Sequence, residues 1–209
     1  WVAVFQGKSA LFQSFILSLF LSFSIGLFST FLAFFTSRYL FLARNAEFWK
    51  KLAILPFIIS PIIYAISVNF FFNYFQISAT IVGVSIAQIF IVYPYAMLLF
   101  SGFWNVNHQN KQQLVATLGG NLFLQWKAGI WPEAKWVFYT CLFQSFLISW
   151  FDFGFTQYIG LGKVKTLPIQ VYQLIAEGNP YFAAVASALL LLPPILLLLV
   201  NRAFILKKV

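Results

Sequence analysis

Acidic residues, histidine and cysteine are all scarce in this chain. Its 209 residues include four Asp and Glu in total, one His and one Cys. A single Cys excludes a disulfide framework or a thiolate metal cluster, and a single His excludes a multi-His metal site. Charged residues make up 8% of the chain and hydrophobic residues 62%, whereas a soluble domain has about 25% charged residues. Disordered chains are poor in apolar residues, so the composition leaves an integral membrane protein.

Long uncharged runs are abundant instead. No Lys, Arg, Asp or Glu occurs from Ser9 to Ser37 or from Leu52 to Asn110. A membrane-spanning helix needs about 20 apolar residues, so the first run exceeds the apolar region of a signal peptide and the second exceeds one helix. The polar stretch Asn73–Thr80 predicts a break in the second run. Thr166–Ala176 is apolar but short, and we expect it to be interfacial or re-entrant. The prediction is one all-α polytopic domain over residues 1–209, with spans at about 11–35, 53–72, 81–102, 135–155 and 181–200.

The positive charges predict the orientation. Of 13 Lys and Arg residues, ten fall on one side of the predicted membrane and three on the other. The side rich in Lys and Arg is normally cytoplasmic. The chain is therefore expected to cross the plasma membrane several times, with its C-terminus in the cytoplasm. An odd number of spans with an outside start predicts one further helix upstream. The ten are Arg38, Arg44, Lys50, Lys51, Lys111, Lys127, Lys135, Arg202, Lys207 and Lys208, and the three are Lys8, Lys163 and Lys165.

The predicted cytoplasmic loop, residues 103–130, has its own helical pattern. Leu114, Val115 and Leu118 follow helical spacing, which predicts a short amphipathic helix over 112–118. Gly119 and Gly120 end that helix, because glycine permits a left-handed turn. A second segment over 121–129 starts at the N-cap residue Asn121, and Pro132 opens the next span. This degree of structure indicates a docking surface.

These residues resemble the permease subunits of type I binding-protein-dependent ABC importers, in the branch for sulfate, molybdate, iron, thiamine and polyamines. That family has a cytoplasmic loop of pattern EAA-x3-G-x9-I-x-L-P between the third and fourth spans of a five-span core. Its Gly and Pro fall on Gly119 and Pro132. The other positions depart from the pattern, with Gln113, Leu114 and Val115 in place of Glu-Ala-Ala and Gly129 and Trp131 in place of Ile and Leu. Further similar stretches are Leu55–Pro61, Tyr93–Tyr95, Ser149–Gly154 and Thr166–Pro168 followed by Tyr172.

The resemblance implies a transport function shared among several chains. Two permeases, identical or homologous, form the solute pathway in a bacterial inner membrane. Each loop docks on a cytoplasmic ATPase, which binds ATP and Mg, while an extracytoplasmic binding protein delivers the cargo. This chain would bind no cofactor, metal or nucleic acid itself. The implied coupling residues are Gln113, Leu114, Val115, Leu118, Gly119, Gly120 and Pro132.

Polar residues at membrane depth are the candidates for lining a pathway. Asp152 is the only acid in a predicted span, and such an acid indicates a function by default, although its place near the outer end also allows an interfacial role. Each of the others can line the pathway or join helices by hydrogen bonds. The candidates are Asn69, Asn73, Gln88, Tyr93, Gln144 and Asp152. We expect His108 to be a solvated loop residue and Cys141 a buried small hydrophobe.

Three other classes of function are weighed against the importer. An enzyme is not expected, because the lone His lies in a loop and no two acids are close in sequence. The main alternative is a fragment of a gradient-driven secondary transporter that uses Asp152 as its ion site. Such a fragment would have no use for a structured cytoplasmic loop. The last class is an assembly subunit with no solute pathway of its own, and no ATPase would copurify with such a subunit.

Overall fold

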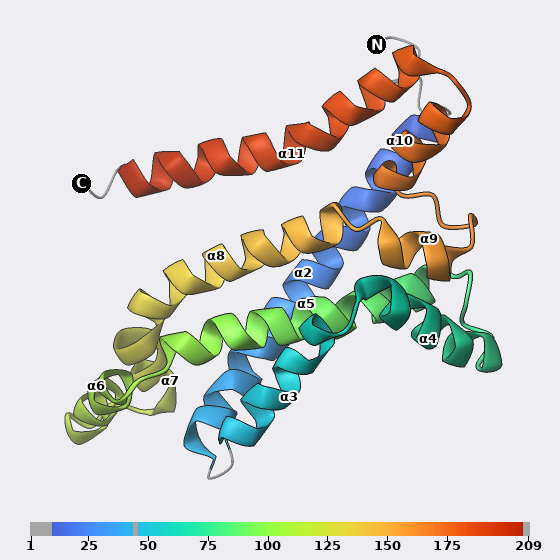
Figure 1. Ribbon diagram of the computed structural model, residues 1–209. Coiled ribbons are helices and arrows are strands. Elements are labelled where there is room, and N and C mark those ends of the chain that lie inside the picture. The colour runs from blue at the N-terminus through green and yellow to red at the C-terminus, as the bar shows by residue number, and fades with distance from the viewer. Residues whose placement is uncertain (1–9, 44–45, 207–209) are drawn as a thin grey trace. The chain divides into compact units, whose positions relative to one another are not determined.

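Every regular element in the described part of the chain is helical. The computed structural model describes residues 10–43 and 46–206, and these contain no β-strand. The charge positions Lys8, Arg44, Lys207 and Lys208 lie outside the described residues. The elements in order (Figure 1) are α2 (Ala10–Leu42), α3 (Ala46–Ile58), α4 (Pro61–Tyr74), α5 (Ile81–Phe103), α6 (Val106–Thr117), α7 (Leu122–Leu124), the π-helical turn η1 (Gln125–Ile130), α8 (Trp131–Trp150), α9 (Gly154–Gly160), α10 (Leu167–Ala176) and α11 (Pro180–Leu206).

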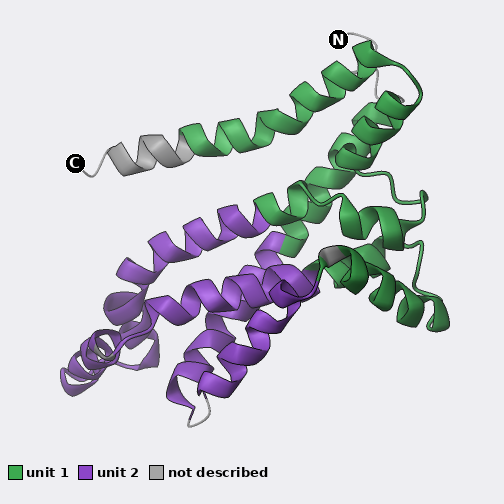
Figure 2. Cartoon of the chain, in the orientation of Figure 1, with its two compact units in different colours: residues 1–25, 60–88, 147–209 green, residues 26–59, 89–146 purple. Residues whose placement is uncertain are grey.

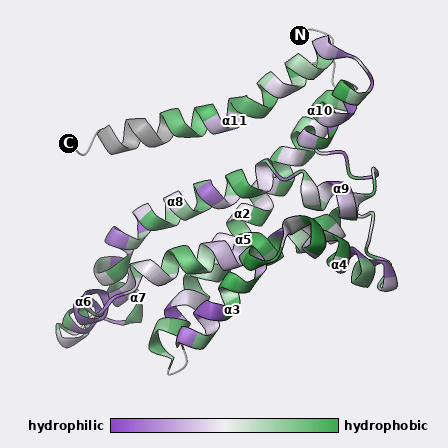
Figure 3. Cartoon of the chain, viewed as in Figure 1, coloured by the Kyte–Doolittle hydropathy of each residue, from purple (hydrophilic) through white to green (hydrophobic). Residues whose placement is uncertain are grey.

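Several of these helices are suited to a membrane. Three are long and apolar enough to cross one, namely α2, α5 and the Pro180–Leu199 part of α11, and the pair α3 and α4 makes a fourth if it is one interrupted span. Helix α8 has 20 residues but is less apolar. Figure 3 shows hydrophobic residues along α5 and α11 and hydrophilic residues gathered at α6. The all-helical prediction is confirmed, and the five-span arrangement stays a prediction.

The second predicted span, 53–72, is interrupted. Helix α3 ends at Ile58, and α4 begins at Pro61 with Ser60 as its N-cap residue. Proline lacks an N–H and its φ suits the first helical turn, so Pro61 begins a new helix more readily than it continues an old one. The predicted span therefore consists of two helices, with the interruption just before Pro61.

The chain divides into two compact units (Figure 2). Unit 1 comprises residues 1–25, 60–88 and 147–209, and unit 2 comprises residues 26–59 and 89–146. In unit 2 an aromatic cluster forms the core around Phe34, which is 4% exposed. Its ring centroid lies 5.2 Å from that of Phe100, 5.5 Å from that of Trp104 and 5.9 Å from that of Phe138. Such tilted and edge-to-face pairs stabilise a core beyond simple burial of area.

Within unit 1, hydrogen bonds between buried polar groups connect segments that are far apart in the sequence. The Trp150 indole N–H donates to the Leu190 carbonyl at 2.9 Å, and the Leu167 N–H donates to the Ser18 hydroxyl at 2.6 Å. The short apolar segment predicted at 166–176 is helix α10, which buries Leu167, Ile169, Gln170 and Leu174 on one face. In an apolar setting each such bond removes the cost of an unpaired polar group.

Candidate functional site

The predicted coupling loop is almost entirely helical. Helix α6 is longer than the expected 112–118 because Asn105 caps its N-terminus, where the Asn105 side chain accepts a hydrogen bond from the His108 N–H at 3.1 Å. Asn105 is a good N-cap residue, but the segment that follows it is polar on all sides. The apolar periodicity that marks a helix therefore starts only at Leu114, which explains the late prediction.

Gly119 ends α6 as predicted. It has φ +81°, its N–H donates to the Ala116 carbonyl at 3.0 Å, and the Gly120 N–H donates to the Val115 carbonyl at 2.9 Å. These two bonds form a Schellman motif. Gly120 is required for a different reason, since an added Cβ would lie 2.7 Å from the Val115 side chain. Both glycines are needed for the turn, one for its φ and one for space.

The second half of the loop leads directly into α8. The Asn121 side chain accepts a hydrogen bond from the Leu124 N–H at 2.9 Å, as expected of an N-cap residue. The segment then continues through the π-helical turn η1 into α8, where Pro132 is the second residue. The expected break before Pro132 is therefore absent. A π turn widens the backbone, which relieves the clash that a proline ring makes with the carbonyl four residues before it.

Apolar side chains of this loop face outward from unit 2. Leu114 is 62% exposed and Leu118 is 81% exposed. Leu122 and Phe123, beyond the glycine turn, are exposed as well, whereas Val115 is partly buried. Large exposed apolar side chains of this kind are candidates for an interaction surface. We call Leu114, Leu118, Leu122 and Phe123 the loop apolar surface.

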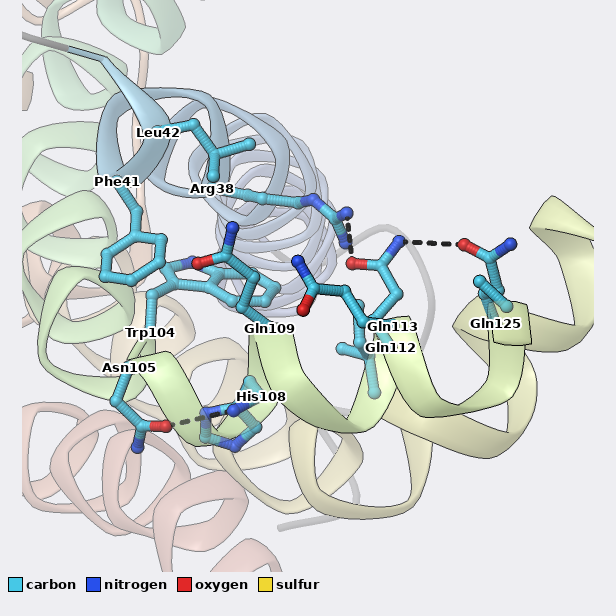
Figure 4. Close-up of a pocket in the computed structure, with 12 residues that line it drawn as sticks. Arg38, Phe41, Leu42, Trp104, Asn105, His108, Gln109, Gln112, Gln113 and Gln125 are labelled. Carbon is cyan, nitrogen blue, oxygen red and sulfur yellow. Dashed lines mark hydrogen bonds between the residues drawn. The ribbon is translucent and has the colours of Figure 1, made fainter. Parts of the chain in front are cut away.

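The opposite side of α6 is attached to α2 through Arg38. The Arg38 guanidinium donates to the Gln112 side-chain oxygen at 2.8 Å, and the Gln112 amide donates to the Gln125 side-chain oxygen at 3.4 Å (Figure 4). The Arg38 Cζ atom also lies 4.0 Å from the centroid of the Trp126 ring, a cation–π contact. This arginine therefore holds both halves of the loop.

A second attachment joins α6 to the start of α8 through Glu133. The carboxylate lies 2.9 Å from the His108 Nε2 atom and also pairs with the Lys111 ammonium. The hydrogen bond from Lys111 and the charges of Lys111 and His108 hold the pKa of Glu133 below its usual range, against the opposing effect of burial. His108 is 7% exposed, so the expectation of a solvated loop histidine was wrong. Its ring is buried because it stacks 4.2 Å from the Phe103 ring and faces this acid.

Asp152 of unit 1 lies in the connection between α8 and α9, at the centre of a second polar cluster. Its Oδ2 atom accepts from the Gln88 amide at 2.8 Å, the Thr156 hydroxyl at 2.8 Å and the Thr156 N–H at 3.0 Å. Its Oδ1 atom accepts from the Phe155 N–H at 3.2 Å, and the Ser149 hydroxyl donates to the Gln88 oxygen at 2.6 Å. Both carboxylate oxygens are thus occupied, and the arrangement joins α5, α8 and the first turn of α9.

The other candidate pathway residues form separate pairs. The Ser78 hydroxyl donates to the Asn69 oxygen at 2.6 Å in unit 1. In unit 2 the Tyr93 hydroxyl donates to Thr36 at 3.1 Å, and the Tyr95 hydroxyl donates to the Gln144 oxygen at 2.6 Å. Asn73 is exposed. Of the six candidates, the structure brings only Gln88 and Asp152 into contact, and the pairs join neighbouring segments as helix-joining polar residues do.

Arg38, Trp126 and Gln112 were not predicted as site residues. The sequence offers a partial signal for two of them. Arg38 is the first charged residue after the long uncharged run, and Trp126 is one of few aromatic residues in the loop. Cys141 is buried as expected, with its thiol 3.9 Å from the Ser145 hydroxyl. Among the described residues no group of three His, Cys, Asp or Glu side chains could hold a metal ion. No protein-family model matches this chain, and no curated protein matches it.

Proposed function

We propose that this chain is the transmembrane permease subunit of an ATP-driven importer of the type I ABC class. It lies in a bacterial inner membrane with its C-terminus in the cytoplasm and forms the solute pathway with a second permease. An extracytoplasmic binding protein brings the cargo. The chain couples to a cytoplasmic ATPase dimer, which binds ATP and Mg, through residues 112–132.

The observation that carries the proposal is the construction of the loop. Its glycine turn and N-cap define two short helical segments, and the loop apolar surface is exposed beside them. The excess of Lys and Arg predicts that this loop is cytoplasmic. An ATPase is the occupant that the resemblance implies. Gln113 in place of the family's Glu removes the carboxylate of an ion pair, and Leu114 and Val115 in place of its two Ala favour apolar contact.

The attachments of the loop supply a mechanical link. A push on the loop apolar surface reaches α2 through Arg38 and Gln112 and reaches α8 through Glu133. The aromatic core around Phe34 packs these elements together, and a close-packed interior transmits displacement because it has few voids to absorb it. Closure of the ATPase would then bias helices of unit 2 between two states, which is what coupling requires.

Purification of the full chain from its native membranes in mild detergent, followed by mass spectrometry of the bound proteins, tests the proposal. The expected result is a copurifying protein with a Walker motif. Leu118→Glu places a charge on the loop apolar surface and should reduce recovery of that protein at least tenfold. Tyr181→Glu, a matched exposed position in unit 1, should not. Failure of any ATPase to copurify with the intact complex would contradict the proposal.

A further inference from the structure

The pocket beside Arg38 contains a cation with no acid to balance it. The pocket has a volume of about 250 Å³ and is lined by residues of α2 and α6, by Trp104 and Asn105 in the connection before α6, and by Gln125 and Ile130 (Figure 4). That volume far exceeds the ~10–15 Å³ that holds one water molecule. None of its lining residues is Asp or Glu. A group larger than water and of negative charge would fit the chemistry.

The hydrogen-bonding capacity of Arg38 is largely unused. A guanidinium carries five N–H donors, and the acceptor that Arg38 finds within the described residues is the neutral oxygen of Gln112. Its Nη1 atom is buried without any hydrogen-bond partner in that part of the chain. Of the two acids of unit 2, Glu133 pairs with His108 and Lys111, and Glu47 lies 3.8 Å from Lys50. A half-buried cation without a paired acid is unfavourable. An anion from outside the chain would balance its charge and accept its unused hydrogen bonds.

Neutral donors surround the same cation. Gln109 and Gln113 lie one helical turn apart and line the pocket beside Gln112, and both are exposed, so their amide groups are accessible. Guanidinium and amide N–H groups together are suited to the oxygens of a phosphate, which arginine binds through two parallel hydrogen bonds. The Trp104 and Trp126 rings beside Arg38 limit its access to water.

The position of the pocket selects a lipid as the source of the phosphate. Arg38 lies near the end of α2, and Trp104 directly follows the end of α5, both of which are apolar enough to cross a membrane. The pocket therefore lies where these helices leave the bilayer. Tyr39 and Leu42, on the last turns of α2, are 76% and 59% exposed and offer an apolar track for an acyl chain. Basic pockets between spans on the cytoplasmic side are suited to anionic headgroups.

We propose that the Arg38 pocket binds the phosphate of an anionic membrane lipid and thereby ties the coupling loop to the lipid composition of the cytoplasmic leaflet. The lipid phosphate bonds the Arg38 guanidinium and the amides of Gln109 and Gln113. Occupancy stabilises the Arg38–Gln112 contact that holds α6 against α2. The lipid binding does not depend on the importer assignment, since it needs only the membrane and the pocket, whereas its effect on coupling rests on the proposed function.

Native mass spectrometry of the purified full chain, titrated with phosphatidylglycerol or phosphatidylcholine, tests the inference. We expect phosphatidylglycerol to be retained in preference to phosphatidylcholine. Arg38→Gln should weaken phosphatidylglycerol retention about tenfold, since it removes a charge-assisted bidentate site. Arg38→Lys should restore part of it. Lys51→Gln removes the same charge from unit 2 outside the pocket and should stay within about twofold of wild type.

A second variant guards against loss of folding. Gln109→Ala with Gln113→Ala changes two exposed side chains and leaves Arg38 in place, so the protein should melt as wild type does while lipid retention falls about threefold. Inorganic phosphate, added as a competitor at millimolar concentration, distinguishes the source. Equal retention of both lipids, unchanged retention in a folded Arg38→Gln variant, or binding of inorganic phosphate in place of the lipid would each overturn the proposal.

Discussion

Replacing Gly119 with valine should disconnect the loop from its partner without unfolding the protein. An added Cβ at Gly119 meets nothing within 4 Å, so the change introduces no collision. Its cost comes from the backbone, because φ +81° is a left-handed conformation that a β-branched residue resists. A left-handed residue other than glycine costs about 1–2 kcal/mol. That energy lowers the ratio of the intact turn to the open turn roughly 5–30-fold.

A matched variant exists elsewhere in the chain. Gly178 has φ +71° and open space around it, and it ends α10 with the same pair of bonds, from Gly178 to Ile175 at 3.1 Å and from Asn179 to Leu174 at 3.0 Å. Gly178→Val therefore carries the same backbone strain in unit 1. Gly119→Asn is the conservative variant, because asparagine tolerates the left-handed region better than other residues.

Hydrogen exchange and ATPase recovery together measure the outcome. Gly119→Val should speed exchange at the amides of residues 119 and 120 and reduce ATPase recovery by up to about 30-fold, because the turn is open for a larger share of the time. Gly178→Val should speed exchange at its own turn and leave ATPase recovery unchanged, and Gly119→Asn should be intermediate. Wild-type recovery in Gly119→Val, or an equal loss in Gly178→Val, would refute the role given to the loop.

Three further outcomes are expected from the contacts described above. Asp152→Asn should lower the free energy of unfolding by about 1–3 kcal/mol in a thermal melt, because one of two occupied acceptor oxygens becomes a donor. Glu177→Gln in the same unit should not lower it, and equal melting temperatures of the two variants would contradict the structural role of Asp152. The pKa of Glu133 is lowered in the folded protein, so its contribution to stability is present above the ordinary glutamate pKa of about 4.3 and is lost as pH falls through the lower folded value. Glu133→Gln should therefore flatten the dependence of stability on pH in this acidic range. An unchanged slope of stability against pH would refute this prediction. Phe34→Ala should cost about 3–5 kcal/mol and loosen unit 2, whereas the exposed Phe35→Ala should cost little, as a melt in detergent would show.

Features set by local backbone chemistry were predictable from the sequence. The Gly119 turn and the Asn121 cap each follow from one or two residues whose conformational preferences are strong. The long apolar helices α2, α5 and α11 follow from composition in the same way. The π turn before Pro132 could not be predicted from the sequence. Whether a helix breaks or widens before a proline depends on the side chains that pack around it.

The contacts that hold the loop depend on residues far apart in the chain. Arg38 reaches Gln112 across 74 positions, and no spacing rule connects an arginine in one segment with a glutamine in another. His108 is buried because Glu133 and Phe103 meet it in three dimensions, although its polar neighbours in the sequence indicate a solvated loop. Asp152 was a candidate ion site because its contact with Gln88, 64 positions away, has no signal in the sequence, although its donors Phe155 and Thr156 lie three and four positions along the chain.

Site-specific crosslinking in native membranes tests the central claim most directly. A photo-activated amino acid at Leu118, which is 81% exposed, would probe the loop apolar surface, and the same group at Tyr181, 85% exposed, would serve as the control. The proposed function predicts that Leu118 crosslinks to a protein with a Walker motif and that Tyr181 does not. Absence of such a protein from the Leu118 product, or equal crosslinking from both positions, would contradict the assignment of this chain as an importer permease.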